Sequence, residues 1–238
     1  MTLHLRSAAV TDRGLIRSGN QDCVHAGPRL LAVADGMGGM AAGEVASRFA
    51  IEAVAPLDTP IPDEEQVAAL RAAVDAANAR IAEAVAADPA RQGMGTTLTA
   101  LRFSGTQTAL AHVGDSRAYL LRDARLSQVT RDDTYVQMLV DQGVITADQA
   151  AGHPRRAVVT QALQGEPVDP SYTVGVPKAG DRWLLCTDGL STVVSAATIE
   201  QAMRDYAALP DLAARLLDLA LRAGGPDNIT VVVADVTQ

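Results

Sequence analysis

The sequence predicts an α+β fold in which two sheets pack face to face and pairs of helices cover their outer sides. Helical patterns occur in pairs and strand-like runs occur in groups, whereas a parallel sheet would show alternating strands and helices. Apolar residues make up 48% of the 238 residues and charged residues 20%, which is enough apolar material for a large core. Aromatic residues make up only 3%, so the core must be built from Ala, Val, Leu and Ile.

The first part of the chain predicts two strands followed by two helices. Residues 3–11 mix apolar and polar positions, and residues 29–35 are an apolar run typical of a buried strand. Apolar residues recur at helical spacing over residues 41–56, and Pro56 ends that pattern. A second helix is predicted over residues 63–87, where an acidic first turn suits the helix dipole.

The pattern changes to strands from Gly95 onward. Four β-like runs follow one another, and turn residues at 104–105 and 123–124 separate two pairs of them, so an antiparallel meander is expected. These runs are residues 96–103, 106–113, 116–122 and 125–129.

The last part of the chain predicts short helices, further strands and a second helix pair. Two short helices separated by Gly143 are expected within residues 132–152. Strands are then expected at residues 156–163, 171–176, 181–187 and 229–236, and helices at 198–206 and 210–223. No repeat or linker-like segment interrupts residues 1–238, so a single domain is expected.

Charge and cysteine content exclude several functions. The net charge of −8 and the pI of about 4.9 argue against nucleic acid as a partner. Cys23 and Cys186 lie in or beside apolar runs, which favours two buried thiols over a disulfide, and their spacing argues against structural zinc. No signal peptide and no 18-residue apolar stretch is found, so a cytoplasmic chain is expected, and any membrane anchor of a longer parent protein would lie beyond residue 238.

Several apolar runs end in an aspartate beside glycines or other turn residues. LLAVADGMGG at residues 30–39 ends a buried strand at Asp35, and WLLCTDGL at residues 183–190 repeats the arrangement at Asp188. Asp22, Asp115 and Asp227 lie at comparable turns. Any one of them is explained by turn formation or helix capping. Five such aspartates at strand ends instead indicate a shared site, because clustered carboxylates repel each other unless a divalent cation neutralises them.

The residue types favour Mn²⁺ or Mg²⁺, since the carboxylates are oxygen ligands and no His or Cys cluster accompanies them. Two such cations lower the pKa of water and make a nucleophile near neutral pH. Arg17, next to Asp22, has the planar guanidinium that grips phosphate. The expected chemistry is metal-assisted hydrolysis of a phosphoester.

With these residues, the chain resembles a known family, the metal-dependent protein serine/threonine phosphatases of type 2C (PPM) in their bacterial form. The motifs occur in order along nearly the whole chain: RSGNQD at 17–22, VADGMGG at 33–39, GTT at 95–97, VGDSR at 113–117, TDG at 187–189 and DNIT at 227–230. The resemblance implies a four-layer α-β-β-α sandwich with two central antiparallel sheets. It also implies two core Mn²⁺ or Mg²⁺ ions, and a third, weaker one.

The resemblance also implies a role for each matching residue. Asp35 would bridge two metals, the Gly36 carbonyl would help bind one, and Asp188 and Asp227 would complete the direct ligands. Asp22 would act mainly through bound water, and Asp115 would hold the third metal together with Asp188. Arg17 would hold the substrate phosphate, and Asn228 would support the ligands from behind. Water held between the metals would attack phosphorus directly, without a phosphoenzyme.

Two positions depart from the common family pattern. Gln21 stands where many members have Glu, which removes one charge near the metals. Met37 stands where eukaryotic members often have a His thought to protonate the leaving group, so that proton must come from another source.

Residues 131–156 correspond to a mobile flap beside the family's active site. Its residues Asp132, Asp133, His153, Arg155 and Arg156 either touch a phosphoprotein or are ordinary solvated surface. His112 has no other His at ligand spacing and is expected to be a packing residue.

We therefore expect a phosphatase acting on phosphoserine and phosphothreonine, with phosphorylated proteins including Ser/Thr kinases as partners and a monomeric state. One alternative is the same site acting on phosphotyrosine or small phosphoesters. Another is a catalytically silent regulatory module, although such a module has no need to keep the carboxylates. Nucleotide binding at the 36–39 turn is disfavoured because no Gly-Lys-Ser/Thr sequence follows.

Overall fold

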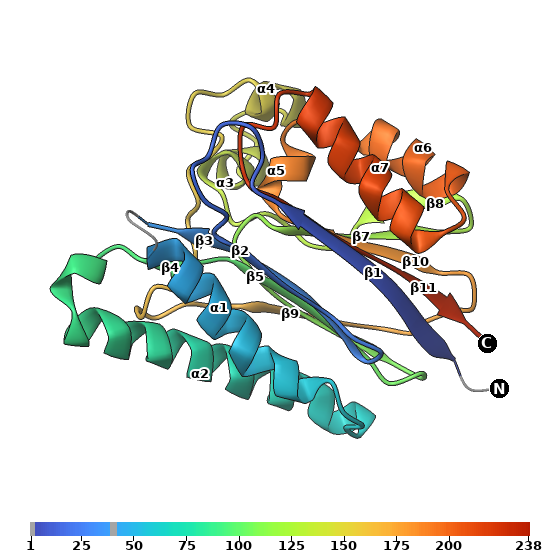
Figure 1. Cartoon of the computed structure of the whole chain (residues 1–238), viewed down its shortest axis with the longest axis horizontal. Coiled ribbons are helices and arrows are strands. Elements are labelled where there is room, and N and C mark those ends of the chain that lie inside the picture. Colours follow the sequence, from blue (N-terminus) through green and yellow to red (C-terminus); the bar gives the residue numbers. More distant parts are fainter. Residues whose placement is uncertain (1–2, 39–41) are drawn as a thin grey trace.

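The computed structural model describes residues 3–38 and 42–238, and its centre is a pair of antiparallel sheets (Figure 1). The first sheet has the order β1 (His4–Asp12), β11 (Ile229–Thr237), β10 (Arg182–Cys186), β7 (Arg117–Arg122) and β8 (Arg125–Gln128). The second has the order β2 (Asp22–Ala26), β3 (Leu30–Met37), β5 (Leu98–Phe103), β6 (Thr108–Val113) and β9 (Ser171–Gly175), and β4 (Gly95–Thr96) pairs with β3.

Helix pairs cover the outer faces of both sheets. Helices α1 (Ala42–Val54) and α2 (Gln66–Ala87) pack on the second sheet, while α6 (Ala196–Asp205) and α7 (Leu209–Arg222) pack on the first. A third apolar cluster, which includes Leu31, Leu101 and Trp183, fills the space between the sheets. The central strands β3, β5, β6, β10 and β11 therefore bury both of their faces, whereas the edge strands β1, β8 and β9 are partly exposed. The predicted α+β sandwich of four layers is confirmed.

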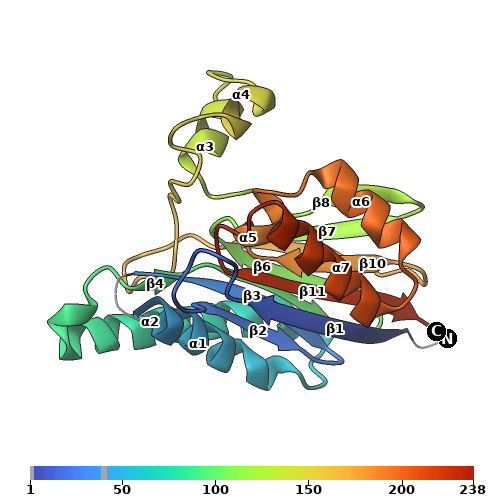
Figure 2. The same cartoon turned by 45° about the horizontal axis from the view of Figure 1, so that its top comes forward.

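Two short helices, α3 (Tyr135–Asp141) and α4 (Ala147–Ala151), stand away from the sandwich, as Figure 2 shows. Thr134 caps α3 and accepts a hydrogen bond from Gln137 N, and Thr146 forms a capping box with Gln149 at the start of α4. Gly143, with a φ of +69°, lies between the two helices. We call residues 131–156 the flap. The one-turn helix α5 (Asp188–Ser191) lies at the end of β10.

Two expectations about strands were wrong, and one strand was missed. Residues 156–163 form only two isolated bridges, Thr134 to Val159 and Thr96 to Leu163, because this segment crosses between elements without a continuous partner. Strand β2 was not predicted, although its Asp22–Ala26 run pairs with β3. The predicted meander is divided: β5 and β6 belong to one sheet and β7 and β8 to the other, because the chain changes sheet at Gly114, whose φ is +102°.

Helix ends differ slightly from the predicted bounds. Ala55–Leu57 and Asp63–Glu65 form 3₁₀ turns that flank α1 and α2, so the helices are shorter than their apolar patterns. The expected start of the first helix at residue 41 and the glycine at 39 lie outside the described residues.

The cysteines and His112 behave as packing residues. Both cysteines are free thiols; Cys186 is buried and Cys23 is half-buried. Buried His112 contacts Thr99 Oγ1 at 2.9 Å and the Arg131 carbonyl at 3.0 Å, which confirms its packing role. None of the helices in the described ranges is long and apolar enough to cross a membrane.

Candidate metal-dependent active site

The strand-end aspartates meet at one end of the sandwich. The register of β2 and β3 places Asp22 directly opposite Asp35, so the two carboxylates share a face of the sheet. Asp188 follows β10 and Asp227 precedes β11, which is the neighbour of β10 in the other sheet. Residues separated by more than 200 positions in sequence are thus brought to one place.

Asp22 is held by two threonine hydroxyls from the opposite sheet. Its Oδ2 accepts hydrogen bonds from Thr187 Oγ1 at 2.8 Å and Thr230 Oγ1 at 2.7 Å. Burial nevertheless raises the pKa of Asp22 to about 7, against the opposing effect of these hydrogen bonds. Its Oδ1 is buried and has no hydrogen-bond partner within the described ranges.

Asp35 is fixed by the backbone around it. Its amide donates to Thr97 Oγ1 at 3.0 Å, and its carbonyl accepts from Thr97 N and Thr96 Oγ1, both at 2.9 Å. Burial first, and then repulsion by Asp22 and Asp188, raises the pKa of Asp35 well above its usual range. At Gly36 a Cβ atom would lie 2.2 Å from the Gly43 carbonyl oxygen, so only glycine permits this close approach.

Asp188 begins α5 immediately after β10. Burial and repulsion by Asp227 raise its pKa, whereas a hydrogen bond with Asp35 lowers it. Its Oδ1 is another buried oxygen without a partner among the described residues. A Cβ at Gly189 would lie 1.9 Å from the Asn228 carbonyl oxygen, so this glycine lets α5 pack against the turn before β11.

Asp227 and Arg17 form an ion pair at the rim. Arg17 Nη2 donates to Asp227 Oδ2 at 2.6 Å, and this bond raises the pKa of the arginine. Just over half of the Arg17 side chain remains exposed (54%), so the guanidinium stays accessible from outside.

Asn228 ties the loop that carries Arg17 to the rest of the site. Its Nδ2 donates to the carbonyls of Arg13 and Gly19 at 2.9 and 2.8 Å, and its Oδ1 accepts from Gln21 N at 2.8 Å. All the hydrogen-bonding groups of the amide are therefore used to fix the backbone of residues 13–21.

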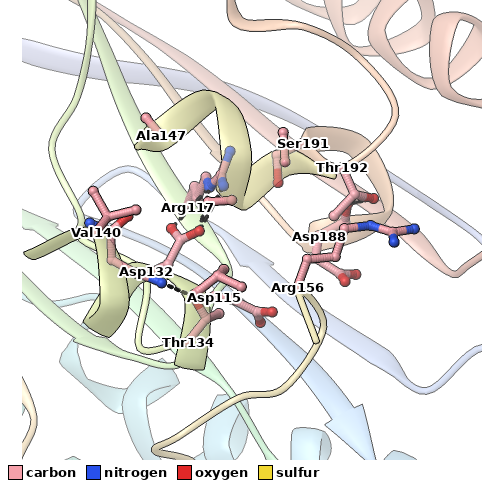
Figure 3. A pocket seen from close by; sticks show the side chains of 14 residues that line it. Asp115, Arg117, Asp132, Thr134, Val140, Ala147, Arg156, Asp188, Ser191 and Thr192 are labelled. Carbon is pink, nitrogen blue, oxygen red and sulfur yellow. Dashed lines mark hydrogen bonds and ion pairs between the residues drawn. The ribbon is translucent and has the colours of Figure 1, made fainter. Parts of the chain in front are cut away.

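Asp115 lies at the sheet-to-sheet turn after Gly114. Burial, with repulsion from Asp188 and Asp132, raises its pKa to about 7. Behind it, Asp132 accepts from Arg117 Nε at 2.9 Å and Nη2 at 2.7 Å (Figure 3). Asp133 accepts from Gly114 N at 2.9 Å, so both flap aspartates are hydrogen-bonded to the protein beside this turn.

One cavity of about 360 Å³ collects most of these residues. Its lining includes Arg17, Asp35, Gly36, Asp115, Asp188, Asp227 and Asn228. Asp22 lies behind this wall, and its position opposite Asp35 follows from the strand register. The sequence-predicted residues are therefore adjacent in the fold.

Comparison with known proteins places this geometry in a family. The model of the family described as protein phosphatase 2C matches residues 17–229. The chain belongs to the protein phosphatase 2C family. The serine/threonine protein phosphatase PstP of Mycobacterium tuberculosis is 55% identical over 99% of this chain, and protein phosphatase PhpP of Streptococcus pneumoniae is 35% identical over 96% of both chains.

Solved structures of the family agree with the fold. The M. tuberculosis phosphatase PstP/Ppp superposes with a TM-score of 0.97 at 54% identity, covering 99% of this chain and 100% of that one. The catalytic domain of PstP in complex with two manganese ions superposes with a TM-score of 0.94 at 54% identity, with full coverage of both chains. This chain spans 46% of the length of the curated PstP relative.

The donor chemistry of this phosphatase 2C site fits a hard divalent cation. Every candidate ligand offers oxygen, and two buried carboxylate oxygens, Asp22 Oδ1 and Asp188 Oδ1, have no partner in the part of the chain that is described. Burial, together with repulsion between the carboxylates, raises the pKa values of Asp22, Asp35 and Asp188, and a bound cation would oppose both effects. Among the described residues, no three Asp, Glu, His or Cys side chains are already close enough together to coordinate one ion. The candidate ligands are instead spread over the walls of the cavity.

Sequence reasoning missed the threonines of this family's site. Thr187 and Thr230 hold Asp22, and Thr97 positions Asp35. A signal existed, because each threonine lies within three residues of a motif aspartate or belongs to a motif itself. The pairing with Asp22 depends on how two sheets face each other, which spacing does not reveal.

Proposed function

We propose that this chain is a metal-dependent protein phosphatase that hydrolyses phosphoserine and phosphothreonine. The observation that carries the proposal is one cavity lined by Asp35, Asp115, Asp188, Asp227 and Arg17. Such a site combines binding groups for divalent cations with an accessible guanidinium for a phosphate. The names of the relatives PstP and PhpP favour protein substrates, and PstP specifically serine/threonine substrates.

Two Mn²⁺ or Mg²⁺ ions would be held in this cavity. Asp35, the Gly36 carbonyl, Asp188 and Asp227 are the proposed direct ligands, and Asp22 is proposed to act through water. Asp115 is the proposed ligand of a third ion, shared with Asp188. When bound, the metals lower the pKa of water and act as Lewis acids toward the phosphoryl oxygens.

Arg17 is proposed to bind the substrate phosphate. Its ion pair with Asp227 fixes the direction of the guanidinium, and its exposed half leaves donors free for phosphate oxygens. Asn228 positions this arginine through the backbone of residues 13–21. Asp227 is thus proposed to serve both the metal and the orientation of Arg17.

Met37 cannot donate the proton that the leaving group requires. Its Sδ lies 3.6 Å from Gln164 Nε2, and Met37 lines the cavity together with Asp35. Proton donation is therefore proposed to come from water within the cavity, which the carboxylates orient.

The finer assignments rest on the family. We propose phosphorylated proteins, including Ser/Thr kinases, as partners, and a monomeric catalytic unit that works in the cytoplasm. The acidic charge of −8 supports protein over nucleic-acid partners. Size-exclusion chromatography with light scattering tests the monomer.

Hydrolysis of a phosphothreonine peptide tests the function. We expect activity with Mn²⁺, none with chelator, and a KM raised about tenfold or more by Arg17→Ala, because a charged hydrogen bond to phosphate is lost. Arg13→Ala, in the same exposed loop, is the matched control and should retain the KM. Activity that persists in chelator would contradict the metal mechanism, and faster hydrolysis of phosphotyrosine peptides would favour the alternative substrate.

A further inference from the structure

A cavity of about 130 Å³ lies between the two sheets, beside the edge strand β9. Leu101 and Leu110 of the second sheet and Trp183 of the first belong to the apolar cluster between the sheets, and all three line this cavity. Leu120 and Val129 add to its apolar walls. The cavity is therefore a gap at the side of the inter-sheet core, where β9 is the last strand of its sheet (Figure 1).

This inter-sheet cavity is separate from the catalytic one, and no described residue lines both. The two cavities lie at opposite ends of the same strands. In β6, Thr108 at the start lines the inter-sheet cavity, whereas Asp115 follows the end of the strand. In β10, Trp183 is near the start and Asp188 follows the end. The residues proposed to bind metals and phosphate therefore take no part in the inter-sheet cavity.

The size and the lining of the inter-sheet cavity suit a single aromatic ring. An engineered cavity of about 150 Å³ with aliphatic and aromatic walls stays dry and binds benzene. A water molecule needs two to four polar partners, which walls made mainly of leucine, valine and tryptophan side chains do not supply. An apolar ring is thus a better occupant of this cavity than water.

Among the described residues that line this cavity, the one charged side chain is already paired. Arg122 Nε donates to Asp181 Oδ1 at 2.6 Å, and Arg122 Nη2 donates to the Val176 carbonyl at 2.9 Å. A charged ligand would lose its hydration here without gaining a free counter-charge. The lining therefore favours a neutral ligand.

Two buried polar groups of the lining lack hydrogen bonds. Trp183 Nε1 has no partner among the described residues, and the hydroxyl of Thr108, a residue only 4% exposed, also forms no hydrogen bond with a described residue. Gly175 stands opposite Thr108 in β9, and a Cβ there would lie 2.9 Å from Thr108 Oγ1. Glycine at this position leaves the hydroxyl uncovered, so a ligand with an acceptor could pair with it.

We propose that the inter-sheet cavity is a binding site for a small neutral molecule that has one aromatic ring and one hydrogen-bond acceptor. The ring packs against Trp183 and the leucines, and the acceptor takes the hydrogen bond that Thr108 does not make within the protein. This site is additional to the proposed phosphatase function and does not depend on it.

NMR spectroscopy with phenol as the probe tests the site. Trp183 is the only tryptophan of the chain, so its indole N–H gives a single signal that reports on this cavity. With the full chain and Mg²⁺, we expect phenol to shift this signal saturably with a Kd of about 1 mM. Benzoate, which has the same ring and a charge, should bind about tenfold more weakly. An indole signal that about 20 mM phenol leaves unshifted, or tighter binding of benzoate than of phenol, would overturn the proposal.

Two neighbouring residues of β9 provide a filled cavity and its matched control. Thr173 lines the cavity opposite Leu110, whereas Val174 is on the other face of the strand and is 53% exposed. Thr173→Phe should weaken phenol binding about tenfold or more, and Val174→Phe should leave the Kd unchanged. The same Kd in both variants would place the phenol outside this cavity and overturn the proposal.

Thr108→Val tests the hydrogen bond, because it removes the hydroxyl with little change of shape. We expect the Kd for phenol to rise about fivefold, and the Kd for toluene, which has no acceptor, to stay the same. An unchanged Kd for phenol would show that Thr108 does not recognise an acceptor. Equal weakening of both probes would show that the substitution alters the shape of the cavity and that the hydroxyl gives no selectivity.

Discussion

At the scale of single residues, the site is built from carboxylates that oppose folding. Burial and mutual repulsion raise the pKa values of Asp22, Asp35, Asp115 and Asp188, so each ionised group is less stable here than in water. For such groups the stability deficit grows as the pH rises from the ordinary value near 3.8 through the raised one. A functional cluster of this kind lowers stability in exchange for ligand binding.

Asp35→Asn should therefore stabilise the metal-free protein while removing activity. The neutral amide removes a buried charge and its repulsion by Asp22 and Asp188, so we expect the free energy of unfolding to rise. Mn²⁺-dependent activity should fall by about a thousandfold or more. Denaturant unfolding in chelator measures the gain, and exposed Asp169→Asn is the control. A less stable Asp35→Asn variant would contradict this account.

His112 predicts a pH dependence of stability. Burial lowers its pKa below the ordinary 6.5, so the unfolded chain binds a proton that the folded chain does not. Its contribution to stability is complete above pH 6.5 and is lost as the pH falls from there toward the lowered value. His112→Gln keeps polar atoms near Thr99 and Arg131 but does not titrate.

The measurement compares the free energy of unfolding of both proteins between pH 7.5 and 5. We expect the unsubstituted chain to lose more stability on acidification than His112→Gln. Parallel curves for the two proteins would show that His112 does not titrate as its burial implies.

At the scale of elements, a few fixed turns connect the strands to the site. Asn228, in the turn before β11, contacts two other segments. Its side chain donates hydrogen bonds to the loop of residues 13–21, and its backbone carbonyl lies close to Gly189 in α5. These contacts position Arg17 and Asp188 relative to each other. The flap is joined to the same region through Asp132 and Asp133.

Asn228→Ala should loosen the loop that carries Arg17. Three hydrogen bonds to Arg13, Gly19 and Gln21 are lost, and we expect about 2–3 kcal/mol of destabilisation together with a raised KM for phosphopeptides. Asn78→Ala is a matched control, since Asn78 also bonds the backbone, at Gly165 and Glu166, but outside the catalytic cavity. That control should lose stability without the increase in KM. An equal KM in both variants would mean that Asn228 does not position Arg17.

At the scale of the whole molecule, the site joins both sheets. Asp22 and Asp35 belong to the second sheet, and Asp188 and Asp227 adjoin β10 and β11 of the first. Cations bound between them would link the two halves of the sandwich, and ligands that bind only the folded state stabilise it by mass action.

Mn²⁺ should accordingly raise the stability of the whole fold. At a concentration of about 100 times its Kd, one bound ion adds about 2.7 kcal/mol to the free energy of unfolding. Thermal or denaturant unfolding with and without Mn²⁺ measures the effect, and Asp35→Asn should lose most of it. A transition that Mn²⁺ does not move would argue against a cation between the sheets.

Much of the fold was predictable because the apolar patterns in the sequence match the burial of the strands and helices that they form. The run at β3 is apolar throughout because both faces of that strand are covered, one by α1 and the other by the first sheet. Asp-Gly at the ends of β3 and β10 marked the site, because close backbone contacts at Gly36 and Gly189 exclude any side chain. Ordered motifs around these aspartates indicated the family from sequence alone.

Other features depend on contacts between distant segments. Strand β2 has no alternating pattern of its own and forms by pairing with β3, while residues 156–163 are apolar enough for a strand but lack a continuous partner. The spacing of residues in the sequence also could not show that Asp132 is hydrogen-bonded to Arg117 and Asp133 to the backbone of Gly114.

The sequence by itself determined the α+β class and the family of this protein, and it supplied the carboxylates proposed as metal ligands and the arginine proposed to bind phosphate. Only the tertiary structure decided which groups act together. It brings the Thr187 and Thr230 hydroxyls into hydrogen bonds with Asp22, pairs Arg17 with Asp227, and forms a second cavity between the two sheets beside β9. The physical reason is that residue type is local, whereas burial, repulsion and hydrogen bonding depend on how two sheets from distant parts of the chain face each other.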